Sequence, residues 1–261
     1  MREIEVFSLP CFREPMSSLS HLLGAVVFTA LAVVLVRRGR GDWCRTASLA
    51  VMAFSTVQLL ILSGLYHMYW PGPLRQLMVR ADVSGVFLLI AGSLTPVHVI
   101  LFRGAARWGP LALAWTAAVV GIILRMVFFD SVSGEAGIAI FLLFGWGAAI
   151  TAAVIYQRYG WAFVRPGVLA GLAYTAGAIV LALHRPTLVA GLVGPHELWH
   201  LAVLTGLGLH WRFVFQFASG RMPDEQREGA VELATAGVPR PHFRTVVSGK
   251  LARRAGRCPR G

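Results

Sequence analysis

The 261-residue chain is 56% hydrophobic and only 14% charged, with a mean hydropathy of +0.66. Ordinary soluble domains carry about 25% charged residues, so this composition excludes a soluble globular protein and indicates a multi-pass membrane protein. The net charge of +12 is almost all arginine, since Lys250 is the only lysine, and the arginines fall between apolar runs and in the tail. We therefore expect lipid headgroups rather than nucleic acid as partners of the basic residues.

Seven apolar segments follow one another along the chain. Each is close to the ~20 residues that cross a bilayer, and frequent small residues suit close helix packing in lipid. The sequence predicts an all-α fold, a seven-transmembrane-helix bundle, over residues 1–218. A basic, polar stretch at 219–261 is predicted to be a disordered tail. The helices are expected at about 18–36, 47–67, 83–102, 108–125, 136–156, 167–184 and 197–218.

The arginine distribution predicts an orientation. Loops on the positive side of the membrane are richer in arginine than loops on the other side, and the basic tail adds to the richer side. We expect the N-terminus outside and the tail in the cytoplasm of a cell (plasma or inner) membrane. The richer side has Arg37, Arg38, Arg40, Arg45, Arg103, Arg107, Arg158 and Arg165; the other has Arg2, Arg13, Arg75, Arg80, Arg185 and, at a boundary, Arg125.

The last apolar segment opens with HELWH, His196 to His200. Residues four apart lie about 40° apart on one helix face, so the two histidines can present imidazole nitrogens to one metal ion. Pro195 stands just before, where a helix readily starts. Imidazole pairs are costly in hydrocarbon unless they bind something, so this stretch is a candidate site.

Counting crossings brings other polar residues to the same membrane face. Segment two ends there with Ser63 and His67, also four apart, and segment three starts there with Asp82 after a short loop. Segment seven starts on that face as well. The first segment adds a further group with regular spacing, Glu14, Ser17 and His21.

Three histidines from two helices favour a zinc site near one membrane face, with His67, His196 and His200 as ligands and one position left for water. Asp82 could deprotonate that water or only orient a ligand histidine, and Ser63 could stabilise an oxyanion or only contribute packing. His21 could support a ligand or bond a neighbouring helix. We expect His98, His184 and His210 to hydrogen-bond neighbouring helices.

The chain resembles the hemolysin III branch of the progestin and adipoQ receptor family, a group related to alkaline ceramidases. The resemblance covers about residues 10–215. It is carried by EPMSSLSH from Glu14, SGLYH from Ser63, Asp82 with the SGVFLLIAGSLTPV that follows it, YTAGAIVLALHRP from Tyr174, and HELWH.

The resemblance implies a seven-helix bundle with zinc held by His67, His196 and His200, and an acid at Asp82 contacting the water on the zinc. Two positions depart from the family pattern: Ser17 stands where asparagine is usual, and Val83 where bacterial members usually have histidine. The first departure bears on the first-helix motif, while the second leaves the three ligands intact. The better-studied receptors have a cytosolic N-terminus, which conflicts with the arginine count; we follow the count.

HELWH also matches the zinc-protease signature H-E-x-x-H, in which Glu197 would be the general base. Such a protease needs a further ligand after the helix, and the first acid after His200 is Asp224, in the polar tail. The family resemblance gives Glu197 no ligand role. We therefore favour Asp82 over Glu197 as the group that acts on water.

Two functions remain open. The first is a ceramidase-like, zinc-dependent hydrolase of a lipid amide or ester, with Asp82 as base and Ser63 at the oxyanion. The second is a receptor or pore-forming (haemolytic) membrane protein in which zinc is structural, with a closed coordination shell. The lipid bilayer is the expected partner of either, and a lipid substrate is expected only for the hydrolase.

Overall fold

The computed structural model describes residues 8–222, and within this range the chain is helical, with two isolated β-bridges and no sheet. Residues 223–261, which hold nearly all of the predicted tail, lie outside the described residues. The helices are α1 (Pro15–Arg38), α2 (Trp43–Met68), α3 (Pro73–Leu101), α4 (Ala105–Val127), the short 3-10 helix η1 (Phe129–Ser131), α5 (Gly134–Trp146), α6 (Ala148–Tyr159), α7 (Trp161–Leu183) and α8 (Pro195–Phe215).

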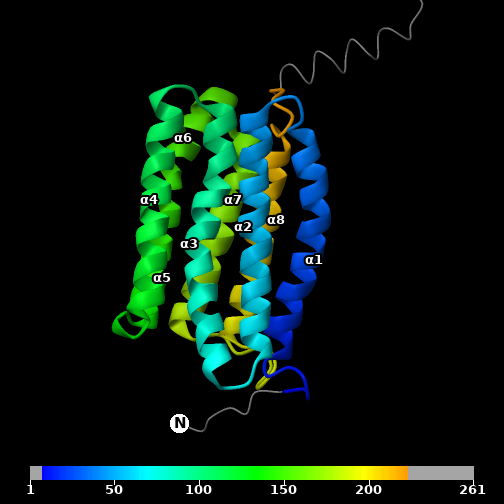
Figure 1. Ribbon diagram of the computed structural model, residues 1–261, viewed down its shortest axis with the longest axis vertical. Coiled ribbons are helices and arrows are strands. Elements are labelled where there is room, and N and C mark those ends of the chain that lie inside the picture. The colour runs from blue at the N-terminus through cyan, green and yellow to red at the C-terminus, as the bar shows by residue number, and fades with distance from the viewer. Residues whose placement is uncertain (1–7, 223–261) are drawn as a thin grey trace, which may run out of the picture. The chain divides into compact units, whose positions relative to one another are not determined.

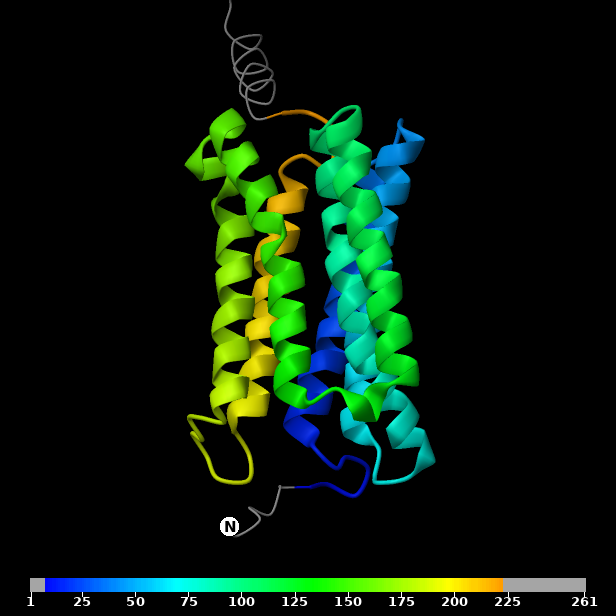
Figure 2. The same ribbon diagram turned by 90° about the vertical axis from the view of Figure 1, so that its left-hand side faces the viewer.

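The long helices lie side by side as an elongated bundle with all loops at its two ends (Figures 1 and 2). α2 packs between α1 and α3, α3 also packs against α4, and α8 packs against α7 and α1. α5 and α6 lie against α7, and α5 also approaches α3. One end of the bundle therefore carries the start of α1, the end of α2, and the starts of α3 and α8 (Figure 1).

Six helical stretches among the described residues are long and apolar enough to cross a membrane: α1 to α4, the stretch Ala136–Tyr159 and α7. α8 is a further long helix of the same bundle, but His196, Glu197, His210 and Arg212 make it more polar than the other six. Two of these polar residues, His196 and Glu197, lie at the start of α8, where the candidate site is.

Two helices differ from the apolar segments that predicted them. α3 begins at Pro73, well before the apolar run, because Arg75, Gln76 and Arg80 are good helix formers that lower hydropathy without ending a helix. Asp82 is therefore inside α3 rather than at its start after a loop, as the sequence had indicated. The segment at 136–156 is divided into α5 and α6 at Gly147.

The core holds the helices of the site in place. Trp211 of α8 is 2% exposed; its indole donates to the Thr56 hydroxyl of α2 over 3.2 Å, and its ring meets Phe28 of α1 edge-on. Near the end of α2, Gly64 lets α1 approach closely, because a Cβ there would lie 2.6 Å from Leu22. These contacts fix α1, α2 and α8 against one another, with Gly64 beside the candidate site and Trp211 about three helical turns from it.

Candidate metal centre

Three histidines from two helices meet at one end of the bundle. His67 lies in the last turn of α2, and His196 and His200 lie in the first two turns of α8. The Nε2 atom of His196 is 3.1 Å from Nε2 of His67 and 3.1 Å from Nε2 of His200. The candidate ligand atoms all lie within 4.8 Å of one another, so the three rings converge on one point.

The start of α8 is built so that its histidines point inward. Gly194 precedes the helix and Pro195 is its first residue, where the missing N–H of proline costs nothing. The Glu197 carboxylate accepts a hydrogen bond from the Gly194 backbone N–H through Oε2, at 2.9 Å, and one from the Ser17 hydroxyl through Oε1, also at 2.9 Å. Both carboxylate oxygens are therefore engaged in capping α8 and joining it to α1. This occupancy argues against Glu197 as the base of a protease-type site.

His67 is held from behind by a carboxylate. Its Nδ1 contacts Oε2 of Glu14, and the other oxygen of Glu14 accepts from the Arg75 guanidinium at 2.9 Å. Burial raises the pKa of Glu14, but the hydrogen bond from His67 and the charge of Arg75 outweigh burial, so the pKa lies below its ordinary value. The carboxylate form is the one that accepts from His67 and Arg75 together.

Asp82 and Ser63 lie beside the three histidines. Ser63 and Asp82 both line the cavity beside His196 and His200, and Asp82 interacts electrostatically with Ser63 and His67. Ser63 precedes His67 by four residues, so both residues face the site from the same side of α2. The structure thus brings together all five residues that the sequence selected: Ser63, His67, Asp82, His196 and His200.

His21 is a fourth histidine at this site, and it is buried. Its ring stacks on His200 with ring centroids 3.9 Å apart, and neither of its nitrogens makes a hydrogen bond among the described residues. It supports the position of His200 through ring contact. The sequence left two roles open for His21, supporting a ligand histidine or hydrogen-bonding a neighbouring helix. The stacking of its ring on His200 favours the first role.

The remaining described histidines make ordinary structural contacts. His98 of α3 contacts the Thr151 hydroxyl of α6 at 3.2 Å, and His210 of α8 contacts the Ser93 carbonyl of α3, also at 3.2 Å. These two form the contacts between helices expected for lone histidines. His184 differs from the prediction, because it ends α7 in the left-handed conformation and contacts only the Ala182 carbonyl of its own helix.

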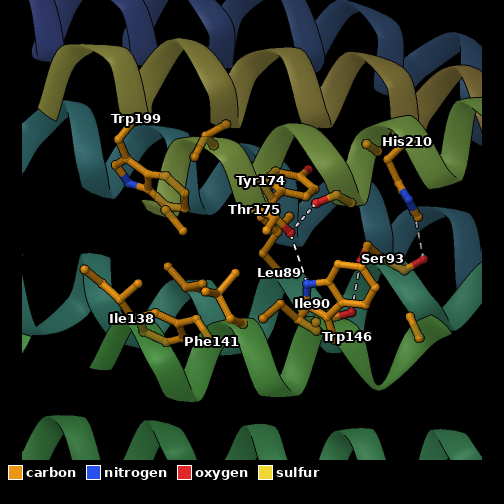
Figure 3. A pocket seen from close by; sticks show the side chains of 18 of the residues that line it. Leu89, Ile90, Ser93, Ile138, Phe141, Trp146, Tyr174, Thr175, Trp199 and His210 are labelled. Atoms are coloured by element: carbon orange, nitrogen blue, oxygen red, sulfur yellow. Dashed lines mark hydrogen bonds between the residues drawn. The ribbon is translucent and has the colours of Figure 1, made fainter. Parts of the chain in front are cut away.

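A cavity of about 970 Å³ extends from His196 and His200 into the bundle. His196, His200, Ser63 and Asp82 line it at the site, and most of the rest of its wall is apolar. Figure 3 shows the wall formed by Leu89 and Ile90 of α3, Ile138 and Phe141 of α5, Tyr174 and Thr175 of α7 and Trp199 of α8. Trp146 closes the wall between α5 and α7 by donating to Thr175 at 3.1 Å (Figure 3).

The cavity wall also includes a buried cation. Arg125, in the last turn of α4, is 7% exposed, donates to the Val132 carbonyl at 3.3 Å and lies over the Phe129 ring. Its Nε has no hydrogen-bond partner among the described residues. The sequence showed Arg125 only as a boundary arginine, and its place in the cavity wall could not be inferred from it.

The sequence assigned no role to two charged residues of the site, Glu14 and Arg75. The spacing of Glu14, Ser17 and His21 placed Glu14 at the same membrane face but could not show its contact with His67. Arg75 carries no such signal, since it is one of two arginines in the polar stretch between the second and third apolar segments. Ser17, which departs from the family pattern, links α1 to Glu197.

The fold and site together define a multi-pass helical membrane protein with a three-histidine candidate metal centre at one end of its bundle. The family model described as "Haemolysin-III related" matches residues 10–211, and the chain belongs to this family. It is similar to "Hemolysin-3" of Bacillus cereus, with 28% identity over 195 residues that cover 73% of this chain and 84% of that protein. It is also similar to "Hemolysin-3 homolog" of Bacillus subtilis (strain 168), with 23% identity over 192 residues that cover 73% of this chain and 87% of that one.

Proposed function

We propose that this protein is a zinc-dependent membrane hydrolase that cleaves an amide or ester bond of a lipid. One observation carries the proposal: the cavity lined by His196, His200, Asp82 and Ser63 continues into an apolar space between membrane-spanning helices. Such a cavity can hold the acyl chain of an amphiphile while its polar linkage stays at the site. In this proposal α8 is the seventh crossing, and the bundle resembles that of the progestin and adipoQ receptors and alkaline ceramidases.

The donor set fits zinc. His67, His196 and His200 offer three neutral imidazole nitrogens that converge, which is the ligand number and type of hydrolytic zinc sites with one open position. Zinc held there supplies a Lewis acid that activates water and polarises a carbonyl. In the proposal, the proton transfers and the stabilisation of the developing charge are carried out by side chains of this protein.

Asp82 and Ser63 have complementary tasks in the proposed reaction. Water adds to the carbonyl carbon and gives a proton to the Asp82 carboxylate. The Ser63 hydroxyl donates a hydrogen bond to the oxygen on which negative charge develops. The bond between the carbonyl carbon and the leaving nitrogen or oxygen then breaks, and Asp82 returns the proton to the leaving group. Glu197 takes no part, because one of its oxygens caps α8 and the other accepts a hydrogen bond from Ser17 of α1.

The cavity wall supports a lipid rather than a polar substrate. A pocket of this size, mostly apolar with a few convergent polar groups, is typical of sites for amphiphilic small molecules. Arg125 places a buried positive charge in the same wall, and it forms no ion pair among the described side chains. That charge favours an acidic group in the lipid or in the fatty-acid product.

A second function draws on the names of the relatives. Proteins named hemolysin could act as pores, and zinc would then be structural. A structural role predicts a fourth protein ligand that closes the coordination shell. Among the described residues, three His, Cys, Asp or Glu side chains form the ligand group, which favours the hydrolase.

The test is hydrolysis by the purified full chain in detergent. The probes are an N-acyl sphingoid lipid and an acylglycerol, each with a fluorescent acyl chain. We expect release of the labelled fatty acid from at least one probe, its loss with a zinc chelator and its return with added zinc. A protein that binds zinc, cleaves neither probe and releases dye from lipid vesicles would support the pore instead.

A further inference from the structure

Glu14 stands directly behind the proposed metal ligand His67. It is the residue before α1, and its segment is attached to the end of α2 by two backbone hydrogen bonds: Glu14 N–H donates to the His67 carbonyl at 3.1 Å, and Arg13 N–H donates to the Met68 carbonyl at 3.3 Å. The last carbonyls of a helix otherwise lack hydrogen-bond partners, so these two bonds fix the backbone of Arg13 and Glu14 against the end of α2. The same glutamate thus holds His67 by its backbone and by its side chain.

The side chain of Glu14 is itself fixed by its surroundings. Arg75 of α3 donates to Oε1 at 2.9 Å, and the same guanidinium lies 4.3 Å from the ring centroid of Tyr66. The Ser18 hydroxyl donates to the Gly64 carbonyl at 2.8 Å, which joins the first turn of α1 to α2 one turn before His67. Oε2 of Glu14 is therefore presented to Nδ1 of His67 from a rigid frame.

The contact determines which nitrogen of His67 is free. A carboxylate accepts hydrogen bonds and cannot donate one, so Nδ1 of His67 carries the proton and Nε2 keeps its lone pair. Nε2 is the atom that faces His196, at 3.1 Å. Among the described residues, His67 is the only one of the three histidines whose ring contacts a carboxylate.

We propose that Glu14 is a positioning residue for the metal: it fixes the tautomer and orientation of His67 and makes its Nε2 a stronger ligand. The inference rests on the metal role proposed above for His67, and it adds a residue outside the five that the sequence selected. Carboxylates that hold a ligand histidine typically contribute 10- to 100-fold to metal affinity.

The experiment measures zinc affinity of the purified full chain by competition with a chromogenic chelator, which is independent of hydrolysis. We expect Glu14→Ala to weaken zinc binding by about 10- to 100-fold and Glu14→Gln to weaken it less, because the amide oxygen can still accept from Nδ1. Asp130→Asn is the matched control, an acid at the same end of the bundle that pairs with Arg80 at 3.0 Å, and it should bind zinc as the parent does.

A double substitution separates positioning from a general structural effect. If Glu14 acts through His67, adding Glu14→Ala to His67→Ala should cost no further zinc affinity. An equal loss in both backgrounds would show that Glu14 acts by holding α1 and would overturn the proposal. If Glu14→Ala does not fold, Glu14→Gln decides: unchanged affinity in that variant also overturns it. A parent protein without bound zinc refutes the metal site itself, and intact zinc binding without lipid cleavage refutes only the hydrolase.

Discussion

Two acids near the histidines, Asp82 and Glu197, should respond in opposite ways to the same isosteric change. Asp82→Asn keeps size and hydrogen bonding but cannot accept a proton. If Asp82 is the general base, the variant should retain zinc and lose lipid hydrolysis by about 10²-fold or more. If Asp82 only supports a ligand, zinc affinity should fall instead, by about 10- to 100-fold.

Glu197→Gln should affect stability and leave the chemistry intact. The amide oxygen can accept from Gly194 N–H, and the amide NH₂ can donate to a rotated Ser17 hydroxyl, so both 2.9 Å contacts can be kept. The loss is then mainly a negative charge at the N-terminus of α8, about 0.3–1 kcal/mol. That corresponds to a fall in Tm of about 1–4 °C for a chain of this size.

The assay is cleavage of the fluorescent lipid by both variants at equal zinc occupancy, with thermal unfolding measured in parallel. Hydrolysis by Glu197→Gln should stay within about tenfold of the parent, which equals 1.4 kcal/mol in the barrier. A reversed pattern, with Asp82→Asn active and Glu197→Gln inactive but folded, would refute our assignment and restore the protease-type arrangement. If both Asp82→Asn and Glu197→Gln hydrolyse the lipid as the parent does, neither acid takes part in the reaction.

The other predictions concern the metal, the topology, the packing and the cavity. Elemental analysis should find about one zinc per chain in detergent, retained in His98→Ala and mostly lost on alanine substitution of each ligand, His67, His196 and His200. A reporter active only in the cytoplasm should be active when fused after Ser219 if α8 is the seventh crossing and the arginine bias sets the orientation; activity of only a periplasmic reporter there would contradict this. Gly121→Ala should lower the free energy of unfolding by about 1–3 kcal/mol, because its Cβ would lie 2.4 Å from the Phe87 ring, and an unchanged denaturation midpoint would contradict that packing. Arg125→Met should weaken inhibition by added fatty acid about 10-fold or more if the buried charge binds a carboxylate, with inhibition by a fatty alcohol as the unaffected comparison.

Local patterns in the amino-acid sequence were enough to predict the class of protein and to select the candidate site residues. Apolar runs of about 20 residues indicated membrane-crossing helices, since backbone polar groups in lipid must be satisfied within the helix. Helical spacing placed His196 and His200 on one face of α8, and Ser63 and His67 on one face of α2. Counting crossings put those faces at one end of the membrane. Each inference uses only local periodicity and the alternation of helix direction.

How the candidate residues meet depends on packing between helices, which the sequence patterns do not specify. His67 and His196 are 129 positions apart, and their 3.1 Å approach depends on how α2 and α8 are rotated about their axes. Most helices here are apolar around much of their circumference, so periodicity does not fix that rotation. Packing between helices produces three further features of the site. These are the hydrogen bonds to both Glu197 oxygens, the contact of Glu14 with His67, and the cavity whose wall includes Arg125. Those contacts distinguish a capping glutamate from a base and a boundary arginine from a buried one, because identical side chains differ in chemistry only through what surrounds them.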